Sequence, residues 1–141
     1  MFDILLRLII AGVIGIIIGW FNINRIQGMR VFALICIGAA LVTIVSTNLL
    51  STANIYGVAD PGRMSAQILF ALGFLGLGLI WIGNDNRVHG ISILANMWLV
   101  SIIGILIGMG LNSRNVAVII TIICILVFLN LRTVFRMRNE E

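Results

Sequence analysis

Five polar residues lie in or beside long apolar runs, where polar side chains are costly and often functional: Arg30, Asp60, Arg63, Gln67 and Asn96. Arg63 and Gln67 are four residues apart and would share one helix face. With Asp60 they would form a hydrated mouth facing the bundle, and with Arg30 and Asn96 they would line a path for an ion or small solute. A simpler interpretation stays open: Asp60 caps a helix, Arg63 reaches lipid head groups, and the amides join helices by hydrogen bonds.

Metal and catalytic chemistry have little support. The acidic residues lie only at the ends of apolar runs or in loops, whereas a magnesium site normally needs carboxylate ligands. His89 stands alone in a short loop, and Cys36 and Cys124 lie in separate apolar runs with no cysteine or histidine beside them. We therefore expect no metal site, no cofactor and no enzymatic activity.

The composition indicates a membrane protein. Of the 141 residues, 61% are hydrophobic and only 10% are charged, whereas soluble domains carry about 25% charged residues. The apolar runs are longer than the strands of a barrel and do not alternate, so we expect helices. The predicted fold is all-α, a polytopic membrane bundle of about five transmembrane helices within residues 1–135, followed by a short cytoplasmic tail at 136–141. The expected spans are residues 4–21, 31–50, 64–82, 91–110 and 116–135.

The charges suggest the surroundings and the orientation. Net charge is +4, and all nine basic residues are arginine. Because they cluster at the ends of apolar runs, we expect contact with anionic lipid head groups and not with nucleic acid. Arg7, near the start of the first run, is expected to reach the head groups. With the N-terminus outside, six arginines fall in cytoplasmic segments and three outside, which favours that orientation, with the C-terminus in the cytoplasm.

Glycines are spaced for close contact between helices. Gly15 and Gly19, and again Gly104 and Gly108, form small-xxx-small pairs, and the third run contains Gly73 and Gly76. These faces would pack within the bundle, or against a second copy or a larger membrane complex. The segments 13–19 and 102–108 also resemble each other in oppositely directed runs, as an inverted repeat would require.

Several segments resemble the MgtC/SapB family. Residues 60–67, Asp-Pro-Gly-Arg-Met-Ser-Ala-Gln, and 71–78, Ala-Leu-Gly-Phe-Leu-Gly-Leu-Gly, are similar to its "DPxR…GxGFLGAG" signature. Residues 28–30 resemble its "GLRT" segment, and residues 88–98 resemble its "GLTTAAxLW" segment. The resemblance covers about residues 7–110.

The chain departs from the family pattern in three places. Residues 19–24 read Gly-Trp-Phe-Asn-Ile-Asn where the family has "GLERE", so the membrane-edge glutamate is replaced, and we do not expect an ion-linked role that depends on it. Ser92 and Ile93 replace a threonine pair. The sequence also stops soon after the fifth run, where many family members carry a cytoplasmic domain.

The resemblance implies a bacterial inner-membrane protein. Members of the family are tied to growth in low magnesium and to survival inside host cells. They are often called magnesium transporters but are thought to modulate other membrane proteins, including the ATP synthase. We therefore expect a small regulatory or interaction protein linked to magnesium homeostasis and membrane energetics; the alternative is a small transporter or channel for an ion or solute.

Overall fold

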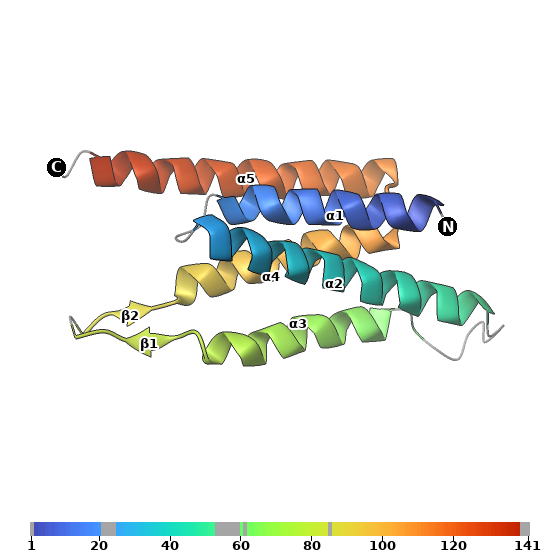
Figure 1. Ribbon diagram of the computed structural model, residues 1–141, viewed down its shortest axis with the longest axis horizontal. Coiled ribbons are helices and arrows are strands. Elements are labelled where there is room, and N and C mark those ends of the chain that lie inside the picture. The colour runs from blue at the N-terminus through green and yellow to red at the C-terminus, as the bar shows by residue number, and fades with distance from the viewer. Residues whose placement is uncertain (1, 21–24, 53–59, 61, 85, 139–141) are drawn as a thin grey trace.

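Within its described residues the chain folds into five helices and one short hairpin (Figure 1). The computed structural model describes residues 2–20, 25–52, 60, 62–84 and 86–138. The helices are α1 (Phe2–Trp20), α2 (Arg25–Thr52), α3 (Gly62–Leu77), α4 (Ile91–Met109) and α5 (Ser113–Arg138), and the hairpin joins β1 (Trp81–Ile82) to β2 (Val88–His89). The predicted all-α class is confirmed.

Three helices are long and apolar enough to cross a membrane within the described part of the chain. These are α1, residues Gly28–Asn48 of α2, and α4, which have 19, 21 and 19 residues. A helix needs about 20 residues to cross a 30 Å hydrocarbon layer. The apolar part of α3 has 16 residues, and that of α5 covers Ser113–Leu126. The crossing of the membrane by all five helices therefore stays a prediction.

The distribution of side chains is that of a protein dissolved in lipid. Large apolar side chains face outward, with Phe70 84% and Phe74 76% exposed, while Thr43, Ser46 and Ser101 are buried. In water such an apolar surface would be a liability. In hydrocarbon it is the favourable arrangement, because polar groups then need partners inside the bundle.

Helix α2 is the centre of the bundle. It packs against α1 on one side and α4 on another, α3 contacts both α2 and α4, and α5 packs against α4. The core between α2 and α4 is formed by apolar side chains from both helices: Phe32, Cys36, Ala40, Val100, Ile103 and Ile107. The protein thus has a continuous interior despite its apolar exterior.

The third apolar run does not continue as a helix to residue 82. Helix α3 ends at Leu77, and the chain then turns into the antiparallel hairpin, in which Trp81 pairs with His89 and Ile82 with Val88. Gly90 has φ 96°, and a Cβ there would collide with the carbonyl oxygen of Leu79, so a close approach of two backbone segments requires glycine. Hydropathy alone missed this turn because residues 79–82 are as apolar as the helix before them.

The other helix ends differ from the predicted ones by up to six residues. Helix α2 begins at Arg25 instead of residue 31, and α4 ends at Met109 instead of residue 110. Helix α5 runs through the predicted tail as far as Arg138, and residues 139–141 lie outside the described residues.

Candidate functional site

The first glycine pair joins α1 to α2. A Cβ at Gly15 would lie 2.6 Å from the Cα of Ala33, and one at Gly19 would lie 2.6 Å from the Cα of Met29. Because these neighbours are backbone atoms, no side-chain rotation can make room. The later glycine of α1, Gly19, meets the earlier residue of α2, Met29, so the two helices are antiparallel.

The second pair joins α4 to α2. A Cβ at Gly104 would collide with the carbonyl oxygen of Cys36, and one at Gly108 would lie 2.6 Å from the carbonyl oxygen of Ala40. Here the later glycine of α4, Gly108, meets the later residue of α2, Ala40, so α4 runs parallel to α2. Both small-xxx-small pairs are therefore used inside the chain, and neither is open to a second copy.

The third helix uses its glycines differently. Gly76 is buried against the side chain of Leu94 of α4. Gly73 has no atom within 4 Å of the place where a Cβ would stand. It lies in an outward groove of about 490 Å³, lined by Ala66, Leu69, Phe70, Gly73, Phe74, Leu77 and Trp98. Gly73 is thus a predicted packing residue that borders an unfilled groove.

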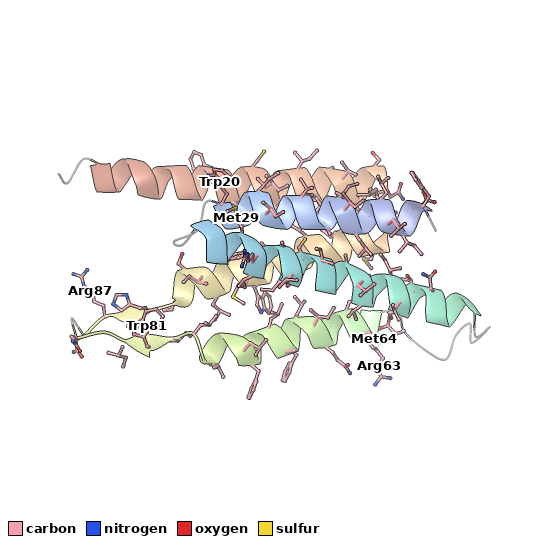
Figure 2. All side chains as sticks on the ribbon, viewed as in Figure 1. Trp20, Met29, Arg63, Met64, Trp81 and Arg87 are labelled. Atoms are coloured by element: carbon pink, nitrogen blue, oxygen red, sulfur yellow. The ribbon has the colours of Figure 1, made fainter. Side chains whose placement is uncertain are left out.

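The residues predicted to form a polar mouth do not face the bundle. Asp60, Arg63 and Gln67 are all exposed, and Arg63 points away from the other helices (Figure 2). The backbone N–H of Gly62 donates a hydrogen bond of 2.8 Å to Oδ1 of Asp60. The backbone N–H of Arg63 donates one of 3.2 Å to the backbone carbonyl oxygen of Asp60. Asp60 therefore caps the start of α3.

The other two predicted path residues lie at the opposite end of the bundle. Arg30 is near the start of α2 and is exposed, whereas Asn96 is near the start of α4 and is 9% exposed. Since α2 and α4 start at the end where α3 finishes, Arg30 and Asn96 are separated from Asp60 by the length of α3 (Figure 1). The structure does not bring the five residues together.

A hydroxyl pair links α2 to α3, which the sequence reasoning missed. The Oγ1 of Thr43 and the Oγ of Ser65 are 3.2 Å apart, with Thr43 1% and Ser65 7% exposed. The Thr43 hydroxyl also donates to the carbonyl oxygen of Ala39, at 2.8 Å. Serine and threonine are common in spans, so their presence was a weak signal, and only the packing of α3 on α2 makes this pair.

The end of α4 is closed by side chains from two other helices. Nη1 of Arg7 in α1 lies 3.4 Å from the carbonyl oxygen of Gly108, and Nδ2 of Asn115 in α5 donates to that of Gly110 at 2.8 Å. Carbonyl groups are unpaired at a helix C-terminus and carry partial negative charge there, so a cation is favourable. Arg7 therefore contacts α4 within the protein, although it was expected to reach the lipid head groups.

The described part of the chain shows no cluster of side chains suited to binding a metal ion. No group of three or more histidine, cysteine, aspartate or glutamate residues could hold an ion there. The ring of His89 stacks on Trp81 in the hairpin, with centroids 5.6 Å apart. Cys36 is buried in the bundle, whereas Cys124 is exposed on α5.

Comparison with known proteins places this architecture in a family. The chain is 37% identical over 128 residues to the protein MgtC of Salmonella typhimurium (strain LT2), an alignment that covers 88% of this chain and 51% of that protein. It is 33% identical over 146 aligned positions to the Escherichia coli (strain K12) protein named "Putative magnesium transporter YhiD", covering 99% of this chain and 66% of that one.

A shorter match concerns the MgtC protein of Brucella abortus (strain 2308), 34% identical over 102 residues, covering 72% of this chain and 40% of that one. The chain thus spans about half the length of the MgtC proteins it matches. No solved structure matches it. The model of the MgtC family matches residues 8–137, which contain α2, α3 and α4 and most of α1 and α5, and the chain belongs to the MgtC family.

Proposed function

We propose that this protein is a regulatory or interaction protein of the bacterial inner membrane, linked to magnesium homeostasis and membrane energetics. In this proposal all five helices cross the membrane, with the N-terminus outside and the C-terminus in the cytoplasm. It acts by docking the outer face of α3 against a transmembrane helix of a larger membrane protein, and it catalyses no reaction.

The groove on α3 is the observation that carries the proposal. Ala66 and Gly73 are seven residues apart, two helical turns, and so lie on one face of α3, beside the exposed rings of Phe70 and Phe74. Helices in lipid associate through van der Waals packing at small residues that allow close approach. The small-xxx-small pairs around Gly15 and Gly104 are already occupied inside the chain, whereas the place of a Cβ at Gly73 on α3 is open.

The groove on α3 suits a partner helix, whereas the interior of the bundle is poorly suited to cation transport. The interior residues that the structure describes supply hydroxyl and amide groups, among them Thr43, Ser65 and Asn96, but no carboxylate. Transport of a divalent cation normally depends on carboxylate ligands. The buried polar groups do favour one second candidate, a small transporter or channel for an ion or small solute.

The experiment is recovery of partners from native membranes with Gly73→Leu, compared with Gly38→Leu. Both glycines have open space where a side chain would stand, but Gly38 lies on α2, away from the groove. We expect Gly73→Leu to lose a membrane protein that the wild type and Gly38→Leu both retain. If Gly73→Leu retains every partner of the wild type, docking on α3 is refuted; if only a second copy of this chain is recovered, the occupant is a homodimer.

Transport is tested separately in proteoliposomes that contain only this protein. We expect no flux of magnesium, monovalent cations or anions above that of empty vesicles. Flux that disappears when Asn96 is changed to leucine would favour the transporter. The orientation is checked by a C-terminal reporter that is active only in the cytoplasm.

A further inference from the structure

A second groove lies between α1 and α2, at the end of the bundle where α1 finishes. Its volume is about 420 Å³ and it is lined by Ile16, Met29, Arg30, Ala33 and Leu34. The groove follows from the glycine seam. Gly15 brings α1 onto the Cα of Ala33, so the small Ala33 forms a floor between the exposed side chains of Ile16 and Leu34.

Among the described residues that line this groove, Arg30 is the charged one, and it lies at the outer end. Ala33 and Leu34 follow it by three and four residues, so all three share one face of α2. Met29 is level with Gly19, near the last residue of α1, whereas Ala33 is level with Gly15, one turn deeper. The groove therefore runs from a cation at the helix end into the apolar part of the bundle.

The neighbouring tryptophan marks the depth of that cation. Trp20 ends α1, is 55% exposed, and lies near Met29 at the same end of the bundle (Figure 2). Exposed tryptophans concentrate at the boundary between hydrocarbon and water. Arg30 is thus at the level of lipid phosphates, and the groove below it is at the level of acyl chains.

This pairing of a cation with an apolar channel selects among possible occupants. A guanidinium makes two parallel charge-assisted hydrogen bonds to a phosphate. A free phosphate would leave the apolar walls unused, and an apolar partner helix would cover the arginine without a counter-charge. We propose that this groove binds one anionic phospholipid, with its phosphate on Arg30 and one acyl chain along Ile16, Ala33 and Leu34.

The test is native mass spectrometry of the protein released from bilayers of equal parts phosphatidylglycerol and phosphatidylcholine. An arginine at an anionic membrane surface favours the anionic lipid by about fivefold, so we expect about that excess of phosphatidylglycerol in the retained lipid. With Arg30→Gln, the retained lipid should contain the two phospholipids in equal parts, as the bulk bilayer does. Arg63→Gln is the matched control, because Arg63 is also exposed but lines neither groove, and its excess should be unchanged.

Two further arms separate a lipid site from a phosphate site. Ile16→Trp narrows the groove without changing the charge and should lower the total retained lipid by severalfold. Inorganic phosphate at millimolar concentration should not displace the lipid. The proposal is overturned if Arg30→Gln keeps the excess, if Arg63→Gln loses it equally, if Ile16→Trp retains as much lipid as the wild type, or if inorganic phosphate displaces the lipid. Each variant must first show wild-type helical content by circular dichroism.

Discussion

The seam between α1 and α2 allows a sharp prediction, because its closest contacts are backbone atoms. In Gly15→Ala the new methyl group would lie 2.6 Å from the Cα of Ala33, 2.8 Å from the carbonyl oxygen of Phe32 and 2.9 Å from the nitrogen of Ala33. Non-bonded carbon atoms prefer about 3.5 Å or more, so the two helices must separate by about 1 Å. Overpacking of this kind costs about 1–3 kcal/mol of unfolding free energy.

Gly38→Ala is the matched control, because that glycine is also inside a helix but has no atom within 4 Å of the added methyl group. We expect its unfolding free energy to stay within about 1 kcal/mol of the wild type and to rise rather than fall, since alanine has the higher helix propensity. The assay is equilibrium unfolding by SDS titration in mixed micelles, followed by tryptophan fluorescence.

A double variant tests whether backbone atoms cause the effect. Ala33→Gly removes a methyl group from the neighbour but leaves the Cα that Gly15→Ala would meet. It should therefore not rescue Gly15→Ala, and the coupling energy of the two changes should be close to zero. A Gly15→Ala protein as stable as the wild type, or full rescue by Ala33→Gly, would refute the backbone seam.

Three other predictions concern single contacts. Arg7→Met should lower the unfolding free energy by about 1 kcal/mol, because the cation at the end of α4 is lost, and Arg7→Lys should recover part of this; equal stability of all three would contradict the contact. A double-mutant cycle of Thr43→Val and Ser65→Ala should give a coupling of about 0.6 kcal/mol, and strictly additive effects would argue against the hydroxyl pair. In detergent, an uncharged thiol reagent that enters the micelle should label Cys124 faster than Cys36 in the folded protein, and unfolding should abolish the difference; equal labelling rates in the folded protein would show that the core is open.

Much of the fold could be predicted because hydrocarbon imposes a simple rule on length and polarity. An apolar run of about 20 residues must close its backbone hydrogen bonds as a helix, and this located α1, α2, α4 and α5. The rule does not detect where a helix stops inside apolar sequence. The signal for the hairpin was present in the short pairs Trp81–Ile82 and Val88–His89, which flank a loop that contains one glycine, two asparagines and an aspartate, residues typical of hairpin turns.

The contacts were predictable only in part, because glycine spacing shows that a face is used but not which helix uses it. The role of Gly15 and Gly104 as contact residues followed from the sequence, whereas their common neighbour, α2, did not. Arg7 and Gly108 are separated by 101 residues, so no local pattern could indicate that contact. The same holds for Thr43 and Ser65, which belong to different helices.

The two glycine seams also have a mechanical consequence. At both seams the glycines bring the backbone of α1 or α4 directly onto backbone atoms of α2, which cannot turn aside as a side chain can. We therefore expect α1, α2 and α4 to move together as a single rigid plate. Helix α3 is held differently: the atoms nearest to a Cβ at Gly76 belong to the flexible side chain of Leu94 and not to a backbone. A force exerted on α3 would therefore tilt α3 and its hairpin, while the packing of α1, α2 and α4 against one another would stay unchanged.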